Sequence, residues 1–371
     1  MLIHRFHPHV GGAETQLKSL LPHLSARGMN VQVITRQEPG APEREIVDGA
    51  PVFRMPIPKT RGAASLSYTR HALSHLWRHR AQIQLIHAHG LLSPSTTAVL
   101  AQLLLRVPIV VTTHGFEADL ALLSNAAFGR QRFEVINRMV NRFIVISDEI
   151  GLGLQQHGVS ARKLVPVRNG IDVNRFQPAS AVERELQRCR LRVTDRRVVL
   201  YVGRLEPVKG ADCLLDAWPA VLERVPEAEL VIAGDGSCRD ELEARSVPRV
   251  RFLGAQHDPL PLYQAADCYV LPSRSEGLPV ALLEALAVGL PVVSTSVGGA
   301  TEILRGFEHS SLVTPGDPDA LASGIARQLG DSADANQRAV LRRRVEEDYS
   351  IQSTANSLAS LYRSLVGLEV G

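Results

Sequence analysis

Short apolar runs alternate with amphipathic stretches along almost the whole chain. Runs rich in β-branched residues predict strands at residues 31–35, 52–54, 85–87, 109–112, 143–146 and 164–167, after a truncated strand at 2–4. In the second half they predict strands at residues 198–202, 230–233, 250–253, 269–271, 291–294 and 312–313. The stretches between them have helical periodicity, as in residues 14–26. Apolar strands joined by helices are typical of parallel sheets covered on both faces.

The predicted strands are too many for one comfortable sheet, so we expect two doubly wound α/β domains. A length of 371 residues agrees with two or three domains. A polar stretch between residues 172 and 197 marks the boundary, which gives an N-terminal domain of residues 1–172 and a C-terminal domain of residues 173–352. The segment 350–366 is predicted to be an amphipathic helix with Ser350 as its N-cap, and no strand follows it.

The composition is that of a soluble globular protein, with 45% apolar and 21% charged residues. It excludes a disordered chain, a coiled coil and a disulfide scaffold. The formal net charge of +3 argues only weakly for nucleic acid, and we expect none as a partner. The charge is uneven, however, since residues 1–170 contain 19 Lys and Arg against 10 Asp and Glu, and the rest contain 22 against 28. A basic half is followed by an acidic half.

Cysteines and the chain start favour a cytoplasmic protein. No two cysteines have C-x-x-C spacing, which favours free thiols in a reducing compartment: Cys189, Cys213, Cys238 and Cys268. His4 and Arg5 interrupt the apolar start, so no secretory signal is expected. Residues 277–293 are apolar but contain Glu284 and Pro279, which favours a buried helix and strand over a membrane span.

The strongest candidate site lies between Ser275 and Val293. The predicted strand 269–271 leads into a helix with Pro279 at its first position. Glu276 would lie at the mouth of this helix and Glu284 further along its axis. The free amides that would form an anion site belong to Gly277, Leu278 and Val280. Two carboxylates beside an anion site suggest recognition of hydroxyls next to a phosphate. In the simpler alternative, Glu276 only balances the helix dipole and Glu284 reaches solvent, but an idle carboxylate in so apolar a helix is costly.

A second candidate is the loop Gly203-Arg204 to Lys209-Gly210, which follows the predicted strand 198–202. Ligands bind at the carboxyl ends of strands in open α/β sheets. Arg204 offers a planar fork for phosphate oxygens, and Lys209 offers a point charge. Taken alone, this loop could equally be an ordinary solvated surface loop without a ligand. Together with the helix mouth described above, it becomes a candidate diphosphate clamp.

Two glycines mark the turn between the first predicted strand and the helix at residues 14–26. Gly11 and Gly12 permit a close approach of the backbone to a ligand. The full G-x-G-x-x-G pattern is absent, so dinucleotide binding is poorly supported. A tight strand–helix turn explains the pair equally well.

Histidines provide further candidates. His114 follows the predicted strand 109–112, again at a carboxyl end, although a lone histidine there is more often structural than catalytic. Two groups lack the Cys or carboxylate that would complete a metal site: His4, His7 and His9, and His87 and His89. Asp317-Pro318-Asp319 is better explained by a helix start, with Asp317 as N-cap and Pro318 first. We therefore expect no metal.

Residues 59–80, from Lys59 to Arg80, combine basic and apolar side chains. Such a stretch is typical of an ordinary surface helix. A peripheral contact with an anionic membrane at the inner face of the cell membrane is the alternative.

Taken together, these residues resemble the retaining glycosyltransferase family 4 (glycosyl transferases group 1). The resemblance runs nearly end to end. Its most specific part is the Glu-x7-Glu pattern from Glu276 to Glu284, followed by residues 289–293 and strengthened by loop 203–210. It implies the GT-B fold: two Rossmann-like domains face each other across a cleft, and a last helix, residues 353–371, crosses back to the N-terminal domain. The first strand is shorter than is usual in the family.

The resemblance also implies roles for the donor-side residues. Arg204 and Lys209 would hold the diphosphate of a nucleotide sugar. Glu284 would bind the ribose hydroxyls, and Glu276 would bind hydroxyls of the transferred sugar. Amides around residues 277–280 would complete the phosphate cradle.

Four further residues receive roles from the resemblance. The amide of Gly12 would join the phosphate cradle. His114 would lie beside the donor sugar, near the acceptor. Arg251 and Phe252 would lie near the base.

The reaction implied is transfer of a hexosyl or N-acetylhexosaminyl unit to a hydroxyl of a glycan, a lipid-linked intermediate or a small molecule. A UDP-sugar is the favoured donor, and GDP-mannose also fits. The leaving phosphate oxygen would take the acceptor's proton, and no metal or other cofactor would be required. A catalytically inactive sugar-nucleotide-binding subunit on the same fold is the alternative.

Overall fold

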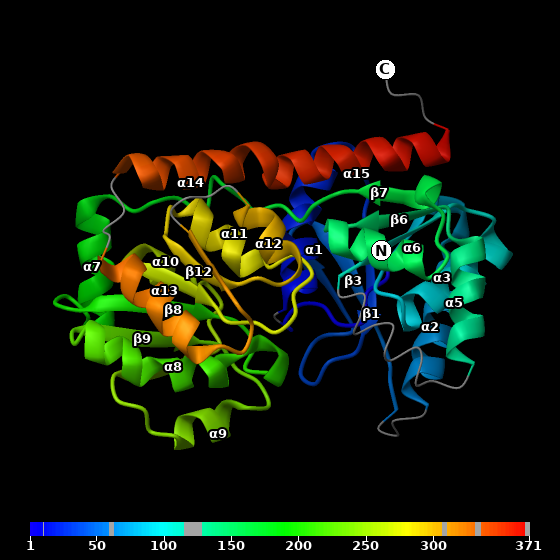
Figure 1. Cartoon of the computed structure of the whole chain (residues 1–371). Helices are drawn as coiled ribbons and strands as arrows, with labels where there is room; N and C mark the ends of the chain where they lie inside the picture. The colour runs from blue at the N-terminus through cyan, green and yellow to red at the C-terminus, as the bar shows by residue number, and fades with distance from the viewer. Residues whose placement is uncertain (10, 59–62, 115–127, 306–309, 331–334, 368–371) are drawn as a thin grey trace. The chain divides into compact units, whose positions relative to one another are not determined.

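The computed structural model describes residues 1–9, 11–58, 63–114, 128–305, 310–330 and 335–367 (Figure 1). The chain divides into two compact units. Unit 1 comprises Met1–Asn169 and Ile351–Gly371, and unit 2 comprises Gly170–Ser350. The boundary we expected after residue 172 lies three residues beyond the observed one.

Unit 1 is built on two groups of strands joined by one residue. The first group is a sheet with the order β1 (Val33–Arg36), β3 (Ala50–Met55), β2 (Arg44–Val47). The second is a parallel sheet of β4 (Ile86–His89), β5 (Ile109–Thr113), β6 (Arg142–Val145) and β7 (Leu164–Pro166). Leu2 pairs with Ile34 of β1 and with Ala88 of β4, so the truncated first strand is reduced to this single bridging residue.

The expectation of purely parallel sheets is wrong for unit 1. Strand β2 runs antiparallel to β3 and was not predicted. Its sequence, Arg-Glu-Ile-Val, is largely exposed, so it lacks the apolar run that marks the other strands. An edge strand with one solvated face does not need such a run.

The described residues of unit 1 form the helices α1 (Gly12–Ser25), α2 (Ala64–Arg78), α3 (Ser93–Leu105), α5 (Gly129–Met139), α6 (Asp148–Gln156) and α15 (Ile351–Val366), with short 3-10 turns at Arg80–Gln82 and Ala161–Lys163. Helix α15 begins directly after Ser350 and packs against α1. The Arg363 guanidinium donates to the Arg27 carbonyl at 2.8 Å, and Arg27 in turn donates to the Asn356 side chain at 2.6 Å. The last helix of the chain is thus part of the N-terminal unit.

Unit 2 has one parallel sheet with the order β10 (Val250–Gly254), β9 (Ala228–Ala233), β8 (Arg197–Val202), β11 (Cys268–Leu271), β12 (Val292–Thr295), β13 (Ser310–Val313). Its helices are α7 (Ala181–Leu191), α8 (Ala211–Arg224), α9 (Arg239–Ala244), α10 (Leu260–Ala265), α11 (Val280–Ala287), α12 (Gly298–Leu304), α13 (Pro318–Gly330) and α14 (Ala335–Asp348), and a 3-10 turn spans Pro207–Lys209. The core packs α8 and α13 on the sheet around the fully buried Trp218. The strand order reverses between β8 and β11, which is where ligands bind in such sheets.

Every strand predicted in unit 2 is present within two residues of its expected ends. The helix start at Asp317 is also confirmed, because the Asp317 carboxylate accepts from the Ala320 amide at 2.9 Å. The four cysteines are free thiols. Within the described ranges, no helix has both the length and the apolar character needed to cross a bilayer.

Candidate active site

The candidate site of unit 2 is built on two loops that leave neighbouring strands at the point of reversal. One loop, residues 203–210, follows β8, and the other, residues 272–279, follows β11. The Arg274 amide donates to the Val208 carbonyl at 2.8 Å. Gly210 has a φ of +67°, and a Cβ there would lie 2.0 Å from the Pro272 carbonyl oxygen. The two loops are therefore in direct backbone contact, which only glycine permits at position 210.

This contact brings Lys209 and Glu276 together. Lys209 Nζ lies 2.7 Å from Glu276 Oε1, and the Lys209 side chain is 20% and the Glu276 side chain 7% exposed. Ser273 Oγ donates to the same carboxylate oxygen at 2.6 Å, and Thr295 Oγ1 donates a hydrogen bond to the Ser273 carbonyl at 2.5 Å. The two residues that we had expected to contact separate parts of a donor are thus joined in an ion pair.

Arg204 is held differently. Its carbonyl accepts from the Tyr201 hydroxyl at 2.8 Å, while its side chain is exposed. Across the part of the chain that the structure describes, nothing lies within hydrogen-bond distance of its guanidinium. The next residue, Leu205, donates its amide to the Asp235 carbonyl at 2.9 Å, which ties this loop to the one after β9. These hydrogen bonds fix the backbone at Arg204, while its exposed guanidinium is available to a ligand.

Glu284 lies in the buried face of α11 and is only 7% exposed. The Tyr263 hydroxyl donates to its Oε2 at 2.8 Å. Burial raises the pKa of Glu284 to about 7, although this hydrogen bond and the positive charge of Arg175 act in the opposite direction. The alternative in which Glu284 reaches solvent is therefore wrong.

The start of α11 differs by one residue from our expectation. Pro279 precedes the helix in an extended conformation with a ψ of 111°, and the helix begins at Val280. The Gly277 carbonyl accepts from the Gly299 amide at 2.9 Å, and a Cβ on Gly299 would lie 2.3 Å from that carbonyl oxygen. The start of α12 therefore packs closely on the stretch that contains Gly277 and Leu278.

Arg251 and Phe252 are not brought to this group. Arg251 lies in β10 and donates to the Glu229 carboxylate at 3.0 Å and to the Leu191 carbonyl at 2.5 Å. Glu229 belongs to the amino-terminal end of β9, whereas the candidate loops leave the carboxyl ends of the strands. Phe252 packs half-buried against the hydrophobic core. Their assignment to the base has no support from these contacts.

In unit 1, His114 follows the carboxyl end of β5 and is not alone. Its Nε2 lies 3.0 Å from Nδ1 of His89, the last residue of β4, and the two rings stack at 5.3 Å. The ring of His89 also stacks on that of His87 at 4.3 Å. His87 in turn contacts the Tyr362 hydroxyl at 2.6 Å and the Thr112 hydroxyl at 2.7 Å. Gly12 is the first residue of α1, and a Cβ there would meet nothing within 4 Å.

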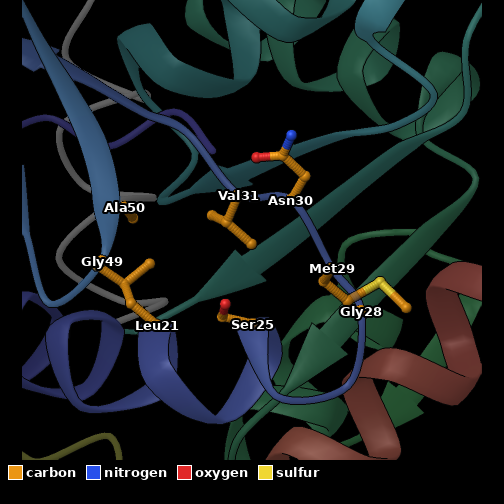
Figure 2. A pocket seen from close by; sticks show the side chains of 8 residues that line it. All are labelled: Leu21, Ser25, Gly28, Met29, Asn30, Val31, Gly49 and Ala50. Carbon is orange, nitrogen blue, oxygen red and sulfur yellow. The ribbon is translucent and has the colours of Figure 1, made fainter.

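The cavity shown in Figure 2 is separate from these residues. It has a volume of about 260 Å³ and is lined by Leu21, Ser25, Gly28, Met29, Asn30, Val31, Gly49 and Ala50. None of these side chains titrates, so the cavity offers no acid–base chemistry. The described residues also contain no group of His, Cys, Asp and Glu side chains arranged to hold a metal ion.

Three features of the structure were not predicted from the sequence: Ser273, Tyr263 and the link between His89 and His114. Ser273 stands three residues before Glu276 in the same loop, which is a usable signal. Tyr263 reaches Glu284 from another helix, so only the tertiary structure reveals it. The histidine link was open to prediction, because β4 and β5 are neighbours and both histidines lie at their carboxyl ends.

Comparison with known proteins identifies the family. The family described as Glycosyltransferase Family 4 matches residues 10–175, and the one described as Glycosyl transferases group 1 matches residues 196–331. The glycogen synthase of Mycobacterium tuberculosis is 31% identical over 293 residues, which cover 75% of this chain and 68% of that protein. The chain belongs to glycosyltransferase family 4.

Other relatives extend the match over nearly the full length. The D-inositol 3-phosphate glycosyltransferase of Corynebacterium urealyticum is 28% identical and covers 96% of this chain and 91% of that protein. A glycosyltransferase of Methanocaldococcus jannaschii that has not been characterised is 43% identical over 144 residues, which are 37% of each chain.

Solved structures confirm the GT-B fold. HepE of Anabaena in complex with UDP and glucose has a TM-score of 0.80 at 22% identity and covers 98% of this chain and 99% of that one. Sucrose-phosphate synthase of Thermosynechococcus elongatus has a TM-score of 0.81 at 24% identity and covers 99% of each. The predictions of family, fold class and transferase activity are confirmed: the chain is a glycosyltransferase of GT-B type that uses nucleotide sugars.

Proposed function

We propose that this glycosyltransferase is a retaining enzyme that transfers a hexosyl or N-acetylhexosaminyl unit from a UDP-sugar to an acceptor hydroxyl. The observation that carries the proposal is the gathering of Lys209, Glu276 and the unengaged guanidinium of Arg204 on the loops at the strand reversal of unit 2. A cationic pair beside a carboxylate fits a diphosphate linked to a sugar. The relative HepE, which was solved with UDP and glucose, supports UDP over GDP.

In this proposal each side chain contacts one part of the donor. Arg204 binds diphosphate oxygens with its planar fork. Lys209 shares its three N–H donors between Glu276 and the diphosphate. Glu276 accepts from hydroxyls of the transferred sugar, and Glu284 accepts from the ribose hydroxyls. The amides at residues 277–280 complete the cradle.

The chemistry follows from where charge develops. As the glycosidic bond to the diphosphate breaks, negative charge grows on the leaving oxygen, and the two cations stabilise it. That oxygen takes the proton of the acceptor hydroxyl, which attacks from the same face, so the configuration at the anomeric carbon is retained. His114 does not serve as the base in this scheme, because burial lowers its pKa to about 4.

The proposal is tested by measuring nucleoside diphosphate release with Lys209→Ala, Arg204→Ala and Glu276→Gln. We expect kcat to fall by about 10²–10³-fold for Lys209→Ala, the usual effect of removing one group that stabilises transition-state charge. Arg224→Ala is the matched control, because Arg224 lies on α8 and its guanidinium donates to the Ser323 hydroxyl at 2.9 Å, away from the two loops. Turnover equal to wild type in both cation variants would contradict the site.

A product with inverted configuration, read from its anomeric proton by NMR, would contradict retention. Donor choice is tested by thermal shift with UDP-sugars and GDP-mannose, since a ligand at 100 times its Kd stabilises by about 2.7 kcal/mol. Binding without turnover on any acceptor would favour the alternative of an inactive binding subunit.

For the acceptor we propose a molecule that carries an anionic group. Arg36, at the end of β1, donates to Ser93 Oγ at 2.9 Å, and Arg132 of α5 donates to Thr96 Oγ1 at 2.6 Å. Both arginines are half-buried, burial lowers the pKa of each, and among the described residues neither has a carboxylate within 4.0 Å. The name of the D-inositol 3-phosphate glycosyltransferase shows that one relative acts on a phosphorylated acceptor. Phosphorylated and lipid-linked glycans therefore belong in the acceptor panel.

We also propose that the enzyme works at the inner face of the cell membrane, through the exposed face of α2. Leu66 and Trp77 are 73% and 47% exposed, and with Arg70 they form one stripe of the helix. Arg80 stacks over the Trp77 ring at 4.7 Å. No Asp or Glu occurs between Asp48 and Glu117. A basic face with exposed apolar side chains fits an anionic bilayer.

A further inference from the structure

Three histidines on β4 and just after β5 form a continuous group in unit 1. His87 and His89 stack on each other, and His89 contacts His114 through one nitrogen of each ring. His89 is 7% and His87 2% exposed. The place near a substrate that the family resemblance implies for His114 does not by itself explain the buried His89.

All three imidazoles are held in the neutral form. Burial lowers the pKa of His114 to about 4, and it lowers the pKa values of His87 and His89 well below their usual range, with a further contribution from their neighbours. A neutral imidazole has one nitrogen that carries a proton and one that carries a lone pair. The nitrogen that carries the proton determines whether His114 presents a hydrogen-bond donor or an acceptor to a ligand.

The tautomer of His89 follows from its second ring nitrogen, Nε2. His89 Nε2 is sealed from solvent, and among the described residues it has no hydrogen-bond partner. A buried N–H without an acceptor is rarer and more costly than a buried lone pair without a donor. Nε2 of His89 therefore carries the lone pair, and its Nδ1 carries the proton.

The hydrogen bond between the two rings then has a single direction. His89 Nδ1–H donates to His114 Nε2 across the 3.0 Å contact. His114 Nε2 is the acceptor, so the proton of His114 resides on Nδ1. His87 does not impose this choice, because its two partners are the hydroxyls of Tyr362 and Thr112, which are able both to donate and to accept.

We propose that His89 is a positioning residue that fixes His114 as the Nδ1–H tautomer, so that His114 presents a hydrogen-bond donor, and no basic nitrogen, to a substrate oxygen. The catalytic meaning of this inference rests on the proposed function, because it requires His114 to contact a substrate of the sugar transfer. Its structural content, the tautomer, does not depend on the reaction.

The tautomer is tested by ¹⁵N NMR of protein labelled on the histidine rings. In wild type we expect His114 to show a protonated Nδ1 and an unprotonated Nε2. His89→Phe keeps the ring volume but removes the donor, and we expect His114 to shift toward the Nε2–H form. His89→Asn restores an N–H close to the position of Nδ1, so it should restore the wild-type pattern. His114 protonated on Nε2 in wild type would overturn the proposal whatever the activity.

The activity of the same variants separates positioning from folding. With the donor that the thermal-shift screen identifies, we expect His89→Phe to lower kcat about tenfold with little change in KM, the effect of one misdirected hydrogen bond. His89→Asn should recover most of the loss. His79→Phe is the matched control, because His79 lies outside the group and its side chain contacts the His75 carbonyl and the rings of His75 and Phe53.

The outcomes are distinguishable. Wild type with the expected tautomer but no turnover on any donor would contradict the proposed function and leave the role of His89 in tautomer choice intact. Equal kcat in wild type and His89→Phe, together with an unchanged His114 spectrum, would overturn the positioning role.

Discussion

Among the described residues Glu284 has one hydrogen-bond donor, the Tyr263 hydroxyl, in a helix whose other side chains are all apolar. Its carboxyl group is therefore easier to protonate in the folded chain than in the unfolded chain, where its pKa is 4.5. The folded state binds the proton more tightly between that value and about 7. Across this pH window the free energy of unfolding falls as pH rises. Above about pH 7 the contribution of Glu284 no longer changes with pH.

Glu284→Gln removes this titration while keeping an acceptor for Tyr263. We expect the variant to gain stability relative to wild type by about 3 kcal/mol between pH 4.5 and pH 8, which is the pKa difference at 1.36 kcal/mol per unit. Denaturant unfolding at both pH values measures it. Parallel stability profiles for the two proteins would contradict the raised pKa.

Individual residues also show where sequence reasoning stops. The residue types of the candidate site were open to prediction, because Arg, Lys and Glu at carboxyl ends of strands suit a phosphate and hydroxyls. The partnership of Lys209 with Glu276 was not, since the two residues are 67 positions apart and meet only when their loops pack. For the same reason the sequence suggested a free cation where the structure has an ion pair.

At the scale of elements, the site depends on how closely two loops approach each other. The β8–α8 loop packs directly on the β11–α11 loop at Gly210, whose backbone conformation is left-handed. A side chain at this position would separate the two loops and with them Lys209 and Glu276.

Gly210→Ala combines two costs, a strained positive φ and a clash with the Pro272 carbonyl. We expect it to lower the free energy of unfolding by more than about 2 kcal/mol, and to weaken binding of a nucleoside diphosphate. Gly158→Ala is the control, because Gly158 has a φ of +86° but open space around its Cβ position. It should cost about 1 kcal/mol and leave binding unchanged. Equal effects of the two substitutions would contradict the contact between the loops.

The elements themselves were largely predictable. Buried parallel strands must be apolar on both faces, so the runs at β4, β5, β6 and the strands of unit 2 stand out. The strand that was missed, β2, has three of its four residues exposed or half-exposed, so burial did not shape its sequence. Leu2 is the opposite case, because this single buried residue pairs with a strand on each side and so takes the place of a whole strand.

At the scale of the whole molecule, the uneven charge corresponds to the two units. The basic residues of unit 1 include Arg70 and Arg78, both exposed on α2. Helix α3 lies alongside α2, since Thr69 and Thr97 share a hydrogen bond of 3.0 Å, and it adds the exposed Leu103 and Leu104.

We expect the protein to sediment with vesicles that contain phosphatidylglycerol and not with neutral phosphatidylcholine vesicles. Replacing both Arg70 and Arg78 by Glu should weaken this binding more than tenfold, since each basic residue near the surface contributes about 1 kcal/mol. The control is Arg224→Glu in unit 2, which should bind like wild type. Equal binding of wild type to both kinds of vesicle, or to neither, would contradict a membrane contact.

The position of α15 has a consequence for the order in which the protein is made. Unit 2 is one continuous segment, whereas unit 1 needs the final helix, which packs on α1 and supplies the Tyr362 hydroxyl to His87. A ribosome delivers the chain from its amino end. Unit 2 therefore has all of its residues before unit 1 does, and the surface of α1 that α15 covers stays uncovered in the nascent chain until α15 emerges.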